Sequence, residues 1–188
     1  MPSLVTSVQG NVVSGDLAAR DVVNTFHEAR KPTPMAKLVE QFLAETTADK
    51  SLTALTERLE HYFSNVTNVD VRGLEEKLIA SDREDLLTSA LLKKQNAYKA
   101  IMRQQSSKSA QTIYTFLMAE IVVNFEQTVQ PLVQAGADRH LVDAAMLEKV
   151  IDPAFNLLES NPLDLDKMDI QGLMYFLAGN CYIRWDAC

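Results

Sequence analysis

The sequence predicts a mainly α-helical fold, a single-domain bundle of about six to seven helices round a buried central helix, with a short N-terminal β segment. Between Ile113 and Phe125, ten of thirteen residues are apolar and fall on every side of a helical wheel, which is typical of a helix with neighbours on several faces. Stretches with apolar residues at helical spacing precede and follow it. Residues 4–25 differ from the rest, because they are rich in valine and hold few strong helix formers.

Composition excludes several classes of protein. The chain has 188 residues, 47% of them hydrophobic and 23% charged, as in one ordinary globular domain. Its net charge is −7, and lysines and arginines gather in isolated pairs only, so we expect no nucleic-acid partner. The first thirty residues lack the pattern of a secretory signal, and no uncharged run reaches about 20 residues, so we expect no membrane insertion and a cytoplasmic location. Cys181 and Cys188 are expected to be reduced thiols.

The N-terminal segment contains three five-residue units that start at Gly10, Gly15 and Arg20. Each has Asn or Asp second and an aliphatic residue third, which suggests coils of a β-roll. A β-hairpin or a partly ordered arm fits the same residues. We therefore expect two parts of the chain, a β-type arm or β-roll over 1–30 and a helical bundle domain over 31–188.

The sequence predicts four helices in the first half of the bundle. Thr33 as N-cap and Pro34 in the first turn start one, a second runs from about Ser51 to Phe63, and a short one covers Gly73–Ala80. Ser81-Asp82-Arg83-Glu84 has the form of a capping box, which opens the fourth. The side chains expected to point inward are Met35, Leu38, Val39, Phe42 and Leu43; Leu52, Leu55, Leu59, Tyr62 and Phe63; and Leu86, Leu87, Ala90, Leu91, Ala97, Tyr98, Ile101 and Met102.

The second half begins with the central helix, Ser109–Gln134. It should end or bend near Pro131, with Gly136 as a stop signal. The next helix should be kinked by Pro153, and a last helix should run from about Met168 to Trp185. Inward side chains of these two are expected to be Leu141, Val142, Ala145, Met146, Val150 and Ile151, and then Ile170, Leu173, Met174, Phe176, Leu177, Cys181 and Ile183.

The sequence contains no phosphate loop, no dinucleotide-binding fingerprint and no nucleophile elbow. His27, His61 and His140 belong to no metal-binding pattern, and His61 and His140 are expected on helix surfaces. Asp164, Asp166 and Asp169 do not fit a calcium loop and are expected to cap the last helix. Cys181 is expected in the core rather than as a nucleophile. We therefore assign no catalytic, metal or cofactor residue, and the chain is more consistent with a protein that is not an enzyme.

The stretch Met174–Trp185 is unusual, because a glycine and an asparagine interrupt an apolar helix and an arginine adjoins the sole tryptophan. A glycine inside a helix costs about 1 kcal/mol relative to alanine, so Gly179 requires close packing or a bend. Arg184 could stack on an aromatic ring or pair with a carboxylate such as Glu120. Two interpretations stay open, a ligand niche or a structural latch formed by Asn180, Tyr182, Arg184 and Trp185.

Both ends of the chain resemble a known family, the C-terminal modules of prokaryotic ABC three-component conflict or defence systems. The family begins with a G-N-[IV]-V-x-G-D-x-A-x-R-D-like segment and ends in an F-L-T-G-N-C-H-I-R-W-like helix. This chain departs from the second motif at Ala178 and Tyr182. It matches the first at Gly10, Asn11, Val12, Val13, Gly15, Asp16, Ala18, Arg20 and Asp21, and the second at Phe176, Leu177, Gly179, Asn180, Cys181, Ile183, Arg184 and Trp185.

The resemblance implies a recruitment or assembly module linked to an ABC ATPase, usually attached to an effector domain, and it supplies no catalytic residue. Because the module begins almost at Met1, we expect a free-standing copy, as in a mobile gene cassette. The function we expect is a non-catalytic interaction module that self-associates as a homo-oligomer through Gly10, Asn11, Gly15, Asp16, Arg20 and Asp21. The alternative is a small-molecule-binding helical protein or enzyme with a cleft near the C-terminal helix.

Overall fold

A computed structural model describes residues 32–45, 55–64, 72–159 and 161–185, all within the unit Pro32–Cys188. The predictions for residues 1–30, including the assembly segment from Gly10 to Asp21, lie outside the described residues. The predicted mainly α fold is confirmed, since the described residues form helices and contain no strand. The elements are α1 (Pro34–Glu45), α2 (Glu57–His61), α3 (Leu74–Ala80), the 3₁₀ turn η1 (Glu84–Leu86), α4 (Leu87–Arg103), α5 (Lys108–Asn124), η2 (Phe125–Val129), α6 (Gln130–Gln134), α7 (Arg139–Ala145), η3 (Met146–Ile151), α8 (Asp152–Asn156) and α9 (Lys167–Gly179).

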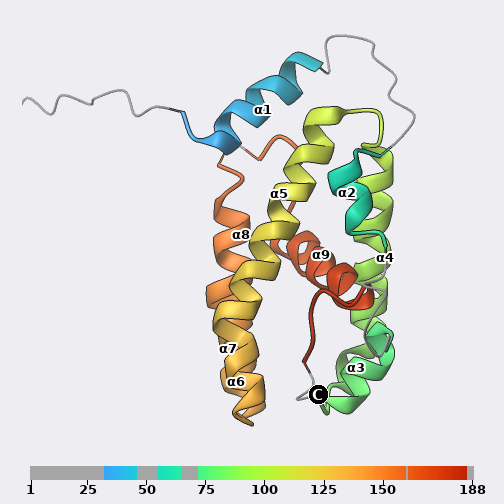
Figure 1. The fold of residues 1–188 in the computed structure, drawn as a ribbon, viewed down its shortest axis with the longest axis vertical. Helices are drawn as coiled ribbons and strands as arrows, with labels where there is room; N and C mark the ends of the chain where they lie inside the picture. Colours follow the sequence, from blue (N-terminus) through green and yellow to red (C-terminus); the bar gives the residue numbers. More distant parts are fainter. Residues whose placement is uncertain (1–31, 46–54, 65–71, 160, 186–188) are drawn as a thin grey trace, which may run out of the picture. The chain divides into compact units, whose positions relative to one another are not determined.

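Helix α5 is central, as its apolar sequence predicts. It packs against α1, α2, α8, α9 and the π segment η3, and Figure 1 shows it between the α7–α8 and α4 sides of the bundle. The neighbours bury most of its apolar side chains, among them Ile113, Leu117 and Ile121. Burial of one such side chain contributes about 1.5–3 kcal/mol to stability. None of the helices in the described ranges combines the length and apolarity that a membrane span requires.

The burial of α5 does not extend all round the helix. Phe116 is 37% exposed and Val123 is 45% exposed, so one side of α5 faces solvent, contrary to the helical-wheel prediction. The same correction applies to several other apolar residues expected to point inward. On each of their helices, the apolar residues occupy a wider face than the neighbouring helices cover. The residues left exposed are Leu43, Leu91, Tyr98 and Leu141.

Two prolines lie inside continuous helical rods. The helix does not end at Pro131; it passes from α5 through η2, a π segment, into α6. The second rod passes in the same way from α7 through η3, also a π segment, to Pro153 in α8. In both, an amide just before the proline bonds to a carbonyl five residues back, Gln130 N–H to Phe125 O and Asp152 N–H to Leu147 O. Because a π turn shifts which carbonyl each amide reaches, the missing proline amide is accommodated.

The ends of the helices show which local signals hold. Thr33 caps α1 as predicted, with its Oγ1 accepting from Ala36 N–H at 3.0 Å. Gly136, at φ 67°, ends α6 as predicted. The capping box predicted at Ser81–Glu84 is wrong, because the Ser81 hydroxyl donates backward to Lys77 O at 2.8 Å and closes α3 instead. The second helix, α2, covers Glu57–His61 and not the range to Phe63, and Thr56 before it is extended. The predicted start at Ser51, with Leu52, lies outside the described residues.

The most extensive helix–helix contact joins α4 and α9. Gly172 lies at their crossing, where an added Cβ would come within 2.7 Å of Lys93 O and 3.2 Å of Ala97 Cβ. Two backbones can approach so closely only where one residue has no side chain. Gly179, for which the sequence predicted close packing or a bend, is the last residue of α9, and only the flexible end of Lys94 lies over it. Gly172 is therefore the glycine on which the helix crossing depends.

Gly172→Ala should destabilise the protein by about 1–3 kcal/mol, because the added methyl group overpacks the crossing of α4 and α9. Thermal and urea unfolding followed by circular dichroism would measure the change. Gly73→Ser is the matched control: an added Cβ at Gly73 meets nothing within 4 Å, and serine is a good N-cap for α3. An unchanged melting temperature for Gly172→Ala would contradict this account of the crossing.

Stability should fall between about pH 10 and pH 12. Burial raises the pKa of Tyr114 from 10.0 to about 12. A neutral phenol favoured by the fold contributes its full stability below pH 10, and that contribution is lost as the pH rises toward the folded-state pKa. Burial also raises the pKa of Tyr175, so Tyr114→Phe should reduce the alkaline drop in melting temperature without abolishing it. An identical drop in the wild type and the variant would refute the role of Tyr114.

Candidate functional site

The residues after α9 form the candidate site. Helix α9 ends at Gly179, and the prediction that it continues to Trp185 is wrong. Cys181 has φ 68°, in the left-handed region, and Tyr182 N–H donates to Leu177 O, five residues back, at 3.0 Å. This is the hydrogen bond of a Schellman turn, with cysteine where glycine is usual. The turn directs residues 180–185, hereafter the C-terminal segment, back across the helices.

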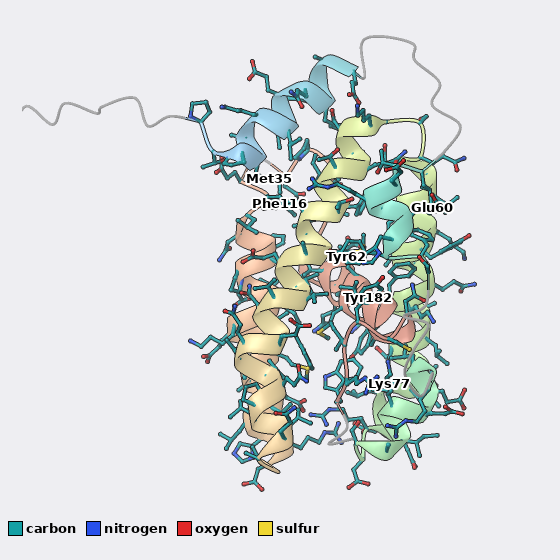
Figure 2. All side chains as sticks on the ribbon, in the orientation of Figure 1. Met35, Glu60, Tyr62, Lys77, Phe116 and Tyr182 are labelled. Carbon is teal, nitrogen blue, oxygen red and sulfur yellow. The ribbon has the colours of Figure 1, made fainter. Side chains whose placement is uncertain are left out.

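The first part of the C-terminal segment binds the end of α2. Asn180 Nδ2 donates to Tyr62 O at 2.8 Å, and the Tyr182 hydroxyl donates to His61 O at 2.6 Å. Tyr182 also packs against Tyr62, with ring centroids 5.2 Å apart, and Figure 2 shows the two side by side. Burial raises the pKa of both phenols. These contacts attach α2 to the end of α9.

Trp185, at the other end of the segment, lies between the two proline-containing rods. Its ring is 3% exposed and meets Phe125 edge-on, with centroids 6.1 Å apart. Its Nε1 donates to Met146 Sδ at 2.9 Å. Phe125 is the first residue of η2 and Met146 is the first residue of η3. The tryptophan therefore contacts both π segments where they begin.

Lys77 is the residue of this region that the sequence analysis missed. It is 2% exposed, and its Nζ donates to Ala178 O at 2.5 Å and to Ile183 O at 3.1 Å. A cation at the carbonyl end of α9 complements the negative end of the helix dipole. The signal was present in the sequence, because helical spacing puts Lys77 on the same face of α3 as Leu74 and Leu78. Figure 2 shows Lys77 on α3.

Arg184 does not have the partners that the sequence suggested. It is half-buried, and within the described part of the chain it has no hydrogen bond or ion pair. Glu120, the carboxylate proposed for it, accepts instead from Asn124 Nδ2 at 2.9 Å. The four predicted residues thus lie on one segment, and three of them contact other helices. Whether Asn180, Tyr182, Arg184 and Trp185 act as a niche or a latch stays a prediction.

The other candidate residues do not form a shared site within the described part of the chain. Cys181 is buried, as expected, and Asp166 caps α9 in a capping box with Asp169, also as expected. His61 and His140 are exposed on helices, whereas His27 lies outside the described residues. Among residues with a described position, no group of three or more His, Cys, Asp or Glu side chains could hold a metal ion.

An open groove lies along α4, beside Phe176 of α9. It has a volume of about 630 Å³, and its walls do not include Asn180, Tyr182, Arg184 or Trp185. The last helix contributes to it through Phe176. The residues that line this groove, hereafter the α4 groove, are Leu91, Leu92, Lys94, Gln95, Tyr98 and Phe176.

Part of the chain is similar to much longer proteins. Proteins described as proteasome-associated ATPases from Mycobacterium sp. strains KMS, JLS and MCS are each 33% identical to it over 95 residues. The match covers 48% of this chain and 15% of each relative, so the chain spans only a small part of their length. No solved structure matches the chain.

A family model covers more than half of the chain. The model for C-terminal domain 9 of the ABC-three component (ABC-3C) systems matches residues 73–185, from the start of α3 to Trp185. The matched range includes the C-terminal motif on which the resemblance was based, whereas the N-terminal motif, Gly10–Asp21, precedes it. The chain therefore belongs to the family of C-terminal domain 9 of the ABC-three component systems.

Proposed function

We propose that the protein is a non-catalytic interaction and assembly module of a prokaryotic, defence-type ABC-three component system. Membership of the family supports the link to such a system and to a partner that is an ABC ATPase. The observation that carries the proposal is the binding of the C-terminal segment to its own chain: Asn180 and Tyr182 bind α2, and Trp185 binds η3. These hydrogen bonds fix the positions of the helices relative to one another, and an assembly module requires such a rigid surface.

In this proposal the C-terminal segment is a structural latch. It joins α2, α9 and the two proline-containing rods, which are separate in the sequence. The Asn180 and Tyr182 bonds go to main-chain carbonyls, and the Trp185 bond goes to a thioether. A hydrogen bond of this kind contributes about 0.5–1.5 kcal/mol to stability, and the buried indole contributes more through its area.

Self-association is assigned to the N-terminal segment. Its valine-rich, short-period sequence suits a β element, and three five-residue units bury too little surface to be stable alone. Pairing with the same segment of a second subunit would cover its edges. A homo-oligomer built in this way presents several copies of the helical unit to a partner.

Small-molecule binding is a second candidate function, and the α4 groove is the observation that favours it. Its volume, about 630 Å³, lies within the range of ligand pockets. The groove is wide open, however, and Leu92 in its wall is 57% exposed. Such a surface suits a macromolecular partner better than a small ligand, most of whose surface is normally buried.

Trp185→Ala should reduce the free energy of unfolding by about 3–5 kcal/mol if the segment is a latch, because it leaves a cavity between the π segments. Chemical denaturation would measure the loss. Two controls are matched to it: Met168→Ala removes a side chain that is 61% exposed, and Arg184→Ala removes one without a hydrogen bond in the described residues. Both should change stability by less than about 0.5 kcal/mol. An unchanged free energy of unfolding in Trp185→Ala would favour the ligand niche over the latch. So would a ligand that stabilises the wild type but not Arg184→Ala.

Light scattering should show a mass above that of one 21.0 kDa chain for the full protein, and the mass of one chain after deletion of residues 1–30. Leu17→Asp in the full chain should have the same effect, because it puts a charge at the third position of a five-residue unit. The same substitution at Leu141, which is 49% exposed on α7, is the control and should leave the mass unchanged. A monomer in every sample would refute self-association.

A further inference from the structure

We propose that the α4 groove binds an acidic amphipathic helix of a partner protein. The inference rests on the proposed function, because it names a surface and a partner chemistry for the interaction module. It concerns α4 and Phe176, and the groove lining contains no residue of the C-terminal segment.

The α4 groove is an apolar surface that the described residues leave uncovered. Leu91 is 41% exposed, Leu92 is 57% exposed and Tyr98 is 45% exposed. Single exposed apolar residues are common, but three on one helix beside a hollow form a patch typical of an interaction site. Burial of exposed leucine side chains is favourable, so a partner that covers this patch gains binding free energy.

The shape of the groove suits a helix. Leu91, Gln95 and Tyr98 follow one another at helical spacing, so the groove runs along α4 for about two turns, roughly 10 Å. An incoming amphipathic helix presents apolar side chains at the same spacing. Two residues of the groove wall are also packed against a third aromatic ring, since Phe63 contacts both Phe176, at a centroid distance of 4.9 Å, and Tyr98, at 5.9 Å.

Charge selects an acidic partner. Helix α4 carries four cations, Lys93, Lys94, Lys99 and Arg103, and no carboxylate, although the whole chain has a net charge of −7. None of the four forms an ion pair with another residue of the described ranges; Lys93 instead donates to the neutral Gln171, at 2.7 Å. Lys94 is in the groove wall, and Lys99 and Arg103 are exposed one and two turns further along. Carboxylates flanking the apolar face of an incoming helix would meet these cations.

The test uses the full-length protein and two labelled synthetic helices of about 18 residues, each with leucines at i, i+4 and i+7. One has glutamates on the positions that flank the leucines, and its control has lysines there. Fluorescence anisotropy should show saturable binding of the acidic helix that weakens at least tenfold as salt is raised, because exposed charges are screened, and no binding of the basic helix. Leu92→Asp and Lys99→Glu should each weaken binding at least tenfold, whereas Leu141→Asp, on α7, should bind like the wild type.

Several results would overturn the inference. These are absence of binding, equal binding of the two helices, or equal loss in Leu92→Asp and Leu141→Asp. Two further measurements test for other occupants of the groove. If Leu92→Asp changes the mass of the protein in light scattering, the groove binds a second copy of this chain. If the protein binds phosphatidylserine vesicles and neither helix, the groove binds a lipid surface. A full-length oligomer that persists in Leu92→Asp, together with no peptide binding, would leave the proposed function standing and remove this inference alone.

Discussion

The fold depends on covering α5. A helix this apolar cannot be stable in water by itself, and each of the surrounding elements buries part of it: α1 and α2 pack near its start, and α9, α8 and η3 pack against it further along. The cover is incomplete at Phe116 and Val123, which remain exposed. The arrangement of the bundle is therefore a consequence of which neighbours reach α5, and α9 has a second task, since it also carries the groove-lining Phe176 and the C-terminal segment.

The two ends of α9 are fixed by different means. Its start is held locally, by the capping box of Asp166 and Asp169. Its end is held from a distance, because Lys77 on α3 donates to Ala178 O and Ile183 O. The middle is set by the close approach at Gly172. With its position determined at three places, α9 can present the C-terminal segment to α2 and to the π segments with little freedom.

Much of the fold could be predicted from the sequence, because it follows from local patterns. Thr33 and Gly136 mark helix ends as predicted, and so do Asp166 and Asp169 at the start of α9. Asp164, also expected to cap α9, is not part of this capping box. The predictions that failed concern positions where local patterns allow more than one conformation. Ser81 has two local choices, and its hydroxyl bonds backward to α3; the turn at Cys181 needs a left-handed cysteine that no propensity favours. The family resemblance located the C-terminal segment, but only the structure identifies the carbonyls that Asn180 and Tyr182 bind.

In each of the two rods, a π segment lies just before a proline, and the two features are physically coupled. Each π turn contains one residue more than an α turn, since its amide bonds to the carbonyl five residues back. Without that residue, Pro131 or Pro153 would stand in the interior of an ordinary helix, at a cost of about 3 kcal/mol. Without the proline, the wide turn would have little reason to persist over the tighter one. In each rod, the π turn and the proline therefore form one structural unit, and a substitution of either changes the conformation that the other requires.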